Sequence, residues 1–401
     1  MSSTSSSTLV GAAFEHVNPR SRIVVGVDTH LGLPEMVAAM GAQRVFVVCG
    51  RTVSVGPQMQ LLRDVLGDSI VGTFDGVRPQ GGRQNLASAA EDLATSGADV
   101  VVSLGGGATI DTAKYLILLH SIQGKLEEYA VPKGKGASAR PSRELSSVAY
   151  RHVAIPTTAG SSSEIMPWAG IRDEELGEKV LFRDPLLVPD IALLDPRFVT
   201  ATGPELTSTS GVTALARAVE SLYSRNRQPI AEALALQALR LLAAGLPRSI
   251  ASGEDLEARQ MTQVGAMLSG IAADNSMVSI VHAIGHAVGG RYGLQHGVAH
   301  RILLPRSADL FLPTVDTALP LVADALGLES SRDKAKDVAS IVDELTRILD
   351  ELPIPRRLRD AGVAEADLAE LAEAAEHEPM MGYSPRPISS TEILDLLHHC
   401  W

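Results

Sequence analysis

The first half of the chain alternates short runs of β-branched residues with stretches of helical pattern, and this alternation is the strongest constraint on the fold. Strands separated by helices pair in parallel, because the connection between them has to cross from one end of the sheet to the other. We therefore expect a parallel sheet with helices over its faces. The strand-like runs are 22–27, 44–49, 69–74, 99–104, 151–155 and 190–194.

The second half of the chain lacks such runs. Segments 230–244, 254–271 and 334–352 place apolar residues three and four apart, which is the spacing of one helix face. Asp195-Pro196 is a boundary signal, since the residue before a proline is held out of helical conformation. The sequence predicts an α/β domain with a parallel sheet over 13–196, an all-α helical bundle over 197–401, and a disordered Ser/Thr-rich tail over 1–12.

Composition narrows the class of partner and the compartment. Of the 401 residues, 47 are acidic and 35 are basic, and a net charge of -12 repels phosphate backbones and anionic lipid. No stretch approaches the roughly 18 to 20 apolar residues of a membrane span. Two cysteines, Cys49 and Cys400, are too few for a disulfide framework. We expect no nucleic-acid partner, no membrane and a cytoplasmic setting.

A triglycine turn follows the fourth strand-like run and opens a helix. Without Cβ atoms, Gly105, Gly106 and Gly107 let the backbone turn tightly and approach a pyrophosphate, whose charge then meets exposed N–H groups at the helix N-terminus. A nucleotide phosphate fits this loop. A tight turn without a ligand stays open as the alternative. For Asp111 the alternative is that an acid in the first helical turn stabilises the helix and has no further function.

A second loop of small residues, 156–164, follows the next strand-like run. Its Thr157 and Thr158 carry hydroxyl groups that can hydrogen-bond a ligand, although Ser, Thr and Gly are also common in ordinary loops. Two such loops at the carboxyl ends of parallel strands are where open α/β sheets bind nucleotides. The pair of loops predicts a dinucleotide-binding domain.

Four of the 11 histidines cluster late in the chain. His282 and His286 are four residues apart and share one helix face, while the glycines that follow allow His296 and His300 to fold back toward them. Clustered imidazoles suit metal binding or proton transfer. Histidines bonded singly to the backbone at a helix end are the alternative.

With these features in order, the chain resembles the iron-containing, or group III, alcohol dehydrogenase family from about residue 14 to the C-terminus. The family's triglycine turn followed by Asp-x-Ala-Lys matches 105–114, and its Pro-Thr-Thr-Ala-Gly-x-x-Ser-Glu loop matches 156–164. The histidine helix matches 281–305. The stretches 14–26, 207–223 and 385–387, together with His300, are similar to the maleylacetate reductase branch.

The resemblance implies a dehydroquinate synthase-like fold in which hydride passes between a nicotinamide and a carbonyl or alcohol carbon in a cleft between the two domains. A homodimer is also implied. For cofactor binding it implies Gly105, Gly106, Gly107, Asp111, Thr157, Thr158 and Lys179, and for the reacting centre His282, His286 and His296.

The resemblance also bears on the choice of cofactor. In many family members an acid after the second strand binds the ribose hydroxyls, but here that position is Gly50, followed by Arg51. Losing a carboxylate and gaining a guanidinium favours a 2′-phosphate. We therefore expect NADPH or NADH, with NADPH favoured, and count Gly50 and Arg51 among the cofactor-binding residues. A solvated Arg51 is the alternative.

The metal ligands of the family are altered. Members bind a divalent ion through an Asp, a His four residues later, and the histidines matching His282 and His296. This sequence has Thr213 and Arg217 at the first two places. A guanidinium does not deprotonate to become a ligand. We expect no tightly bound catalytic metal, and Arg217 as an electrostatic substitute; pairing of Arg217 with Glu220 is the alternative.

The leading hypothesis is a metal-independent NAD(P)H-dependent reductase of a small carbonyl compound, an oxo acid or an aldehyde. Arg291 and Arg301 are candidates for binding a substrate carboxylate, and the acidic tract 365–378 is expected to be solvated. A non-redox lyase or isomerase on the same scaffold and a catalytically degenerate nucleotide-binding protein are the alternatives.

Overall fold

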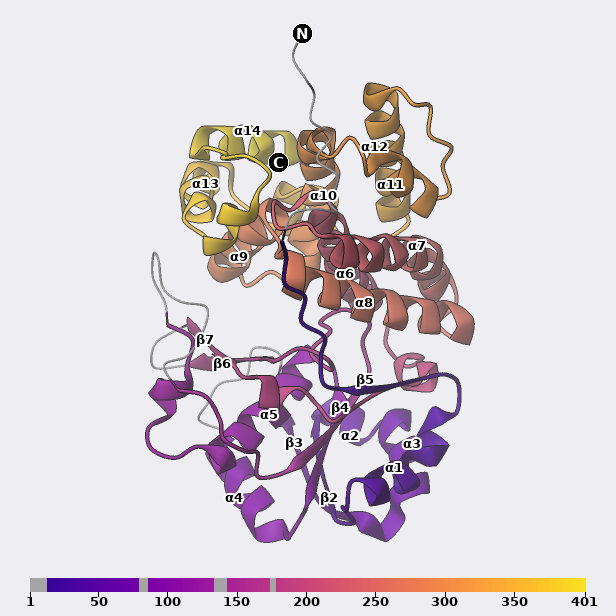
Figure 1. Ribbon diagram of the computed structural model, residues 1–401, viewed down its shortest axis with the longest axis vertical. Coiled ribbons are helices and arrows are strands. Elements are labelled where there is room, and N and C mark those ends of the chain that lie inside the picture. The colour runs from indigo at the N-terminus through magenta and orange to yellow at the C-terminus, as the bar shows by residue number, and fades with distance from the viewer. Residues whose placement is uncertain (1–12, 79–85, 133–142, 174–177) are drawn as a thin grey trace. The chain divides into compact units, whose positions relative to one another are not determined.

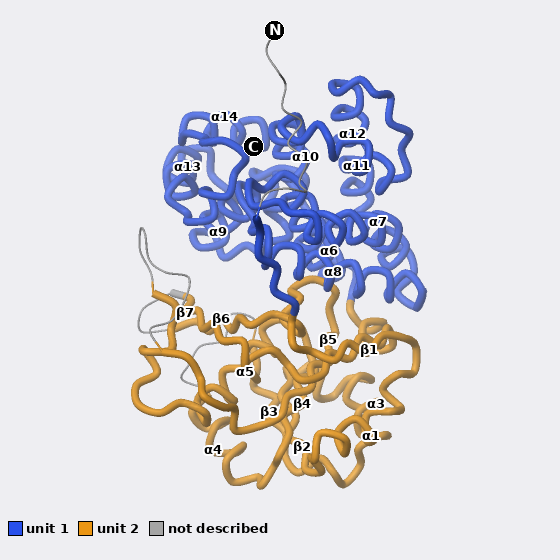
Figure 2. Tube along the Cα trace, viewed as in Figure 1, with its two compact units in different colours: residues 1–18, 203–401 blue, residues 19–202 orange. Residues whose placement is uncertain are grey.

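The computed structural model describes residues 13–78, 86–132, 143–173 and 178–401, so the predicted tail over 1–12 lies outside the described residues. The chain divides into two compact units (Figure 2). Pro19–Thr202 form the sheet unit, and Gly203–Trp401 form the helical unit together with residues 13–18. The division falls after Thr202, whereas the predicted domain ends at Pro196.

The sheet unit is built on a six-stranded sheet of order β1-β8-β5-β4-β2-β3, in which every neighbouring pair is parallel. Its strands coincide with the strand-like runs of the sequence. The predicted α/β class with a parallel sheet is therefore confirmed. The strands are β1 (Arg22–Val25), β2 (Val45–Gly50), β3 (Ile70–Val77), β4 (Val100–Gly105), β5 (Arg151–Pro156) and β8 (Ile191–Leu194).

Helices cover both faces of this sheet, and each face has its own core (Figure 1). Val45, Val47 and Cys49 of β2 join the core beneath α1 and α3. Phe46 and Val48 point the other way, into the core beneath α4 and α5, because successive strand side chains alternate between faces. The helices are α1 (Leu33–Ala39), α2 (Arg51–Ser54), α3 (Pro57–Leu66), α4 (Leu86–Ser96) and α5 (Gly107–Ser121).

The sheet unit also contains a two-stranded antiparallel ribbon that the sequence pattern did not predict. β6 (Trp168–Asp173) pairs with β7 (Glu178–Arg183). Short 3-10 turns complete the unit: Thr29–Gly32, Gly67–Ser69, Leu126–Tyr129, Pro185–Leu187 and Pro196–Val199.

The strand order places a topological switch point between β2 and β4. From β2 the chain moves outward to β3, and from β4 it moves the opposite way to β5. Ligands of open α/β sheets bind outside the carboxyl ends of the strands at such a point. Gly50 and Gly105 are the last residues of these two strands. The predicted ribose position at Gly50 and the triglycine turn therefore both border the switch point.

In the helical unit every element in the described residues 203–401 is a helix, as predicted. The apolar spacing of the sequence accounts for α7, α8 and α12. The helices are α6 (Pro204–Tyr223), α7 (Pro229–Ala251), α8 (Leu256–Ser276), α9 (Ile280–Tyr292), α10 (His296–Phe311), α11 (Leu319–Ala325), α12 (Lys334–Asp350), α13 (Leu368–Glu376) and α14 (Ser390–Cys400). The 3-10 turns are Leu312–Thr314, Arg359–Ala361, Glu365–Asp367 and Pro379–Tyr383.

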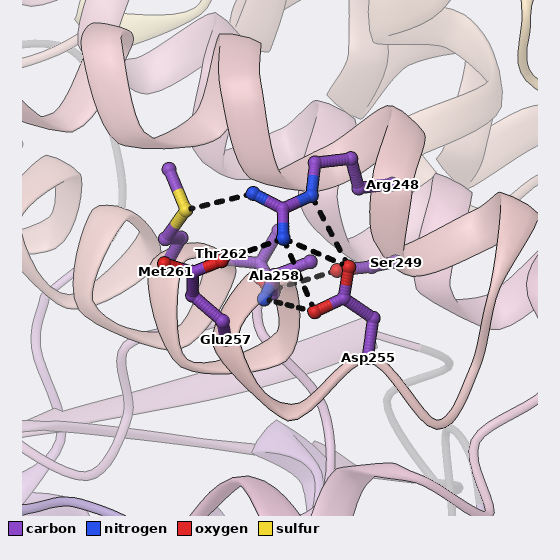
Figure 3. A network of polar contacts seen from close by, with 7 residues as sticks. All are labelled: Arg248, Ser249, Asp255, Glu257, Ala258, Met261 and Thr262. Atoms are coloured by element: carbon purple, nitrogen blue, oxygen red, sulfur yellow. Dashed lines mark hydrogen bonds and ion pairs between the residues drawn. The ribbon is translucent and has the colours of Figure 1, made fainter.

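A polar network fixes the junction between α7 and α8 (Figure 3). Asp255 accepts a 3.0 Å hydrogen bond from Ala258 N and thereby caps α8. The same carboxylate binds the Arg248 guanidinium, which also reaches Glu257 at 2.7 Å. The cap satisfies a helix N–H that would otherwise lack a partner, so the network holds α7 and α8 against each other.

Within the described residues, α7 is the one helix that is long and apolar enough to span a membrane. α8 and α9 reach that threshold only when joined across a bend of 102°. α7 packs along α6 and α8 inside the helical unit, and core helices of globular proteins pass the same test.

Candidate active site

The triglycine turn lies at the end of β4 and the start of α5. Gly106 is the N-cap of the helix and contributes no side-chain hydrogen bond, so no cap of its own occupies the first N–H groups. None of the three glycines has a positive φ. Glycine is instead required for space: a Cβ at Gly107 would lie 2.7 Å from Ser161 Cβ, and one at Gly106 would lie 3.1 Å from Thr158 Oγ1.

The 156–164 loop is therefore the direct neighbour of the triglycine turn. Gly105 pairs with Pro156 across β4 and β5, and Thr157 N donates to Gly105 O at 3.1 Å. Thr157 is buried, and its carbonyl accepts a 2.6 Å bond from Thr202 Oγ1. Thr158 is half-buried beside Gly106. The structure thus brings the two predicted loops together at one edge of the sheet.

Two charged residues of α5 hold this second loop in place. Lys114 is fully buried, and its ammonium donates to the carbonyls of Ser163 at 2.6 Å, Met166 at 2.6 Å and Trp168 at 2.9 Å. The Asp111 carboxylate accepts from Ser163 Oγ and from Gly170 N. Lys179 Nζ lies 3.9 Å from Asp111. The Asp111 carboxylate is thus engaged by the protein itself. The sequence analysis placed Lys114 in the Asp-x-Ala-Lys motif but gave it no role.

The predicted ribose position has an acidic neighbour. Gly50 pairs with Gly76 and Val77 of β3, which brings Asp75 next to the start of α2. Arg51 Nη1 lies 3.2 Å from Asp75 Oδ2, and Ser54 Oγ donates to the same oxygen at 3.1 Å. The Arg51 side chain is 85% exposed. A carboxylate thus does stand near this position, but it comes from β3 and is paired with Arg51.

The helical unit brings the four clustered imidazoles together. The rings of His282 and His300 lie 4.2 Å apart, those of His286 and His296 lie 5.2 Å apart, and those of His296 and His300 lie 5.8 Å apart. His300 is fully buried. Among the described residues neither of its ring nitrogens has a hydrogen-bond partner. Burial and the neighbouring imidazoles lower the pKa of His300 well below its usual value.

Gly285 makes this packing possible. A Cβ at this position of α9 would lie 2.7 Å from His300 Nε2, so only a residue without a side chain lets the ring pack against the helix backbone. The contact places His300 beside His282, which is the closest ring pair of the cluster.

Arg217 lies in α6 and is 8% exposed. The pKa of His282 is lowered well below its usual value, first by burial and second by the positive charge of Arg217. Arg217 lies one turn before Glu220 on the same helix, and Glu220 bonds His282, so the guanidinium lies near the imidazole cluster. Thr213, one turn earlier, donates its hydroxyl back to Thr209 O at 2.9 Å.

Two acidic residues contact the cluster, and the sequence analysis did not predict these contacts. Glu220 is fully buried and its Oε2 shares a short hydrogen bond with His282 Nδ1. Burial raises the pKa of Glu220 to about 8. Glu378 Oε2 lies 3.4 Å from His286 Nδ1. Glu378 ends the acidic tract that we expected to be solvated, and charge alone gave no signal for this contact.

Arg291 and Arg301, the predicted ligands of a substrate carboxylate, both form ion pairs within the protein. Arg291 forms ion pairs with Asp367 at 2.9 Å and with Glu370 at 2.6 Å. Arg301 pairs with Asp350 at 2.8 Å. Both guanidiniums thus pair with carboxylates of their own unit, and their role as substrate ligands stays a prediction.

The sheet unit carries two loops of the kind that bind nucleotides, and the helical unit carries an imidazole cluster. This combination in one chain is typical of one class of dehydrogenase. Residues 19–196 match the iron-containing alcohol dehydrogenase family, and residues 207–401 match the C-terminal part of the Fe-containing alcohol dehydrogenase family. The chain belongs to the iron-containing alcohol dehydrogenase family, and the resemblance in the sequence is confirmed.

Similar proteins agree with this assignment. Maleylacetate reductase 2 of Cupriavidus pinatubonensis is 33% identical over 306 residues, which cover 76% of each chain. The crystal structure of a 1,3-propanediol oxidoreductase superposes with a TM-score of 0.87 at 26% identity, over 97% of this chain and 100% of the other. A sulfoacetaldehyde reductase of Bifidobacterium kashiwanohense, solved in complex with NAD+, has the same fold, with a TM-score of 0.82 at 21% identity over 97% and 99% of the two chains. The relatives support an oxidoreductase, and family members use NAD(H).

Proposed function

We propose that this protein is an NAD(P)H-dependent reductase of a small carbonyl compound that works without a tightly bound metal. One observation carries the proposal. Arg217 is buried in α6 one turn before Glu220, and the Glu220 carboxyl group bonds His282, so a guanidinium lies beside the imidazole cluster. A fixed positive charge directed at a developing alkoxide stabilises it in the way a metal ion does.

The donor set supports the metal-free part of the proposal. Of the four places at which family members bind a divalent ion, two here carry Thr213 and Arg217. The threonine hydroxyl is bonded within its own helix, and the guanidinium repels a cation and cannot be a ligand. The residues present do not fit a divalent ion, and no step is derived through one.

The remaining groups account for the proton chemistry. When hydride reaches the carbonyl carbon, negative charge develops on the oxygen and a proton has to be supplied there. His286 is partly exposed, with Glu378 at its Nδ1, and His282 is buried, with Glu220 at its Nδ1. In each ring Nε2 faces away from the acid, so Nε2–H of His282 or His286 supplies the proton while Arg217 stabilises the alkoxide. A His282 ring that gives up its Nε2 proton takes one at Nδ1 from Glu220, which is protonated below its pKa of about 8.

The sheet unit fits a dinucleotide. The open N-terminus of α5 follows Gly106, which makes no side-chain cap, and its N–H groups and positive end suit a pyrophosphate. We propose that Gly105, Gly106 and Gly107 hold the pyrophosphate and that Thr157, Thr158 and Lys179 contact the cofactor. Asp111 positions the loop through Ser163. When bound, the cofactor supplies the hydride.

For the substrate we propose a carbonyl compound that carries a carboxylate, such as an oxo acid. Arg217 and His300 gather donor groups in the buried part of the cluster, and a carboxylate suits both. The similarity to a maleylacetate reductase supports the same class of substrate.

We also propose a homodimer in the cytoplasm. Both cysteines, Cys49 and Cys400, are buried free thiols, which suits a reducing compartment. The homodimer follows from the family resemblance, and light scattering on the purified chain tests it.

The test is a titration with NADPH and NADH, followed by assays of aldehydes and oxo acids with and without a chelator. We expect dinucleotide binding, and turnover of at least one carbonyl compound that the chelator leaves unchanged. Turnover abolished by the chelator would overturn the metal-independent mechanism. Binding without turnover of any compound would favour a lyase, an isomerase or a nucleotide-binding protein.

A further inference from the structure

Glu220 is held more firmly than any other acid near the imidazole cluster. Its Oε1 accepts hydrogen bonds from Val281 N at 2.8 Å and Ser279 N at 3.2 Å. Tyr223, one turn further along α6, shares a 2.6 Å hydrogen bond with Ser307. These contacts leave Oε2 directed at His282 Nδ1.

The same carboxyl group takes over the capping of α9. Ser279 is the N-cap of this helix but makes no side-chain cap hydrogen bond. Glu220 reaches across from α6 and accepts from the backbone at the start of α9 instead. An acid at a helix N-terminus is favourable, so capping alone gives Glu220 a structural role that any test has to separate from a role in the reaction.

The contact with His282 goes beyond capping. An imidazole has two nitrogens, and the hydrogen bond at one of them decides which proton the other carries. Because Glu220 occupies Nδ1, the nitrogen left for other groups is Nε2. The His282 ring is in turn packed 4.2 Å from the His300 ring, which limits its rotation.

We propose that Glu220 is the positioning residue of His282: it fixes the ring through Nδ1 and so makes Nε2 the nitrogen that meets the reacting oxygen. This inference rests on the proposed function, because it takes His282 as a group at the reacting centre. Glu220 touches neither substrate nor cofactor and acts through His282.

The substitution Glu220→Gln separates positioning from capping. The amide oxygen of glutamine still accepts from Ser279 N and Val281 N, and these two donors disfavour the flipped amide, whose NH2 group would face them. The NH2 group therefore points at His282. It donates to Nδ1, which becomes an acceptor, and the ring proton moves to Nε2.

The measurement is long-range 15N–1H spectroscopy of the histidine rings in the full chain at pH 9, above the pKa of about 8 of Glu220. His282 is assigned by the signals lost in His282→Gln. We expect Nδ1 to carry the proton in the wild type and Nε2 to carry it in Glu220→Gln. A wild-type ring protonated at Nε2, or a tautomer that the substitution leaves unchanged, would overturn the proposal.

A second readout follows the reaction. In the wild type at pH 9, unprotonated Nε2 accepts the proton of an alcohol substrate, and in Glu220→Gln it does not. We expect kcat for alcohol oxidation to fall at least tenfold while KM changes less than threefold. A purely structural role would raise KM and lower kcat together and would contradict the proposal.

Asp195→Asn is the matched control, because Asp195 forms a second buried carboxylate–imidazole pair among the described residues, with His30 Nδ1 at 2.7 Å. We expect it to change the His30 signals and leave those of His282 unchanged. If the His282 tautomer reverses in Glu220→Gln although the wild type turns over no carbonyl or alcohol, the proposed function fails and the positioning stands.

Discussion

Lys114 of the sheet unit and Arg217 of the helical unit are both buried cations, and their surroundings differ. Lys114 of the sheet unit is fully buried and donates to three backbone carbonyls. Arg217 of the helical unit is 8% exposed and lies near imidazoles, whose pKa its charge lowers. The first charge is surrounded by acceptors, and the second lies next to groups that would themselves become cations.

This difference distinguishes a charge that builds the fold from one placed beside titratable groups. A buried charge is tolerated when hydrogen bonds replace its hydration. Around Lys114 the carbonyls do so, and the charge ties the 156–164 loop to α5. A cation beside neutral histidines raises the free energy of every further positive charge there. An anion entering the cluster relieves this repulsion. Replacing Lys114 by methionine should therefore lower mainly the stability of the protein, whereas replacing Arg217 by methionine should lower mainly its activity.

Lys114→Met should have the largest effect. It leaves the carbonyls of Ser163, Met166 and Trp168 buried without their donor, so the free energy of unfolding should fall by about 3 to 5 kcal/mol. Urea denaturation followed by circular dichroism measures it. Lys125→Met, at an exposed position of the same unit, is the control and should be neutral. A Lys114 variant as stable as this control would refute the architectural role of the charge.

Arg217→Met should lower activity and leave stability nearly unchanged. We expect kcat for carbonyl reduction to fall by about 10²- to 10³-fold, the usual effect of removing one group that stabilises an oxyanion, with a change in the free energy of unfolding below about 1 kcal/mol. Arg217→Lys keeps the charge and should recover part of kcat. Steady-state kinetics and the same urea assay decide. An unchanged kcat in the methionine variant would show that Arg217 does not stabilise the alkoxide.

The sheet was predictable because each of its six strands appears in the sequence as a run rich in β-branched and apolar residues. This holds for the buried central strands and also for the edge strands β1 and β3, which are partly exposed. The β6–β7 ribbon was missed for the converse reason. It carries Gly170, Lys179 and Arg183, and a half-buried ribbon with such residues has no comparable signal. Pattern alone thus identifies strands whose sequence is a continuous β-branched run, whether or not the strand is buried.

The candidate site was predictable only where its residues are neighbours in the sequence. The histidines are clustered along the chain and the loops carry recognisable motifs. Glu220 and Glu378 reach the cluster by tertiary packing, from α6 and from the residue before the 3-10 turn Pro379–Tyr383. Asp75 approaches the Gly50 position through the register of β2 and β3. Charge and composition carry no information about such pairings, which follow from how the elements pack.

The histidine cluster should also make stability depend on pH. The pKa of His300 is lowered in the folded chain, so between this value and the usual 6.5 the unfolded chain binds a proton that the folded chain does not. The stabilising contribution is present above pH 6.5 and is lost as the pH falls. We expect the stability of the wild type relative to His300→Gln to decrease by about 2 kcal/mol from pH 7 to pH 5.

Urea denaturation at each pH provides the measurement. His399→Gln is the control, because His399 is exposed and its removal should leave the pH dependence unchanged. A difference between wild type and His300→Gln that stays constant over this range would mean that His300 takes up its proton in the folded state. The imidazole would then not be held neutral by its surroundings.

The smallest effect is expected at the ribose position of the sheet unit, where the charge is exposed and paired with an acid. Arg51→Ala should raise KM for NADPH about three- to tenfold, because an exposed guanidinium contributes a screened interaction to a 2′-phosphate, and should change KM for NADH less than twofold. Asp75→Asn should lower KM for NADPH, since it removes both the partner of Arg51 and a repulsive charge. If Asp75→Asn instead raises KM for NADH and leaves NADPH unchanged, then Asp75 binds the ribose hydroxyls in place of the acid that Gly50 lacks, and NADH is the preferred cofactor.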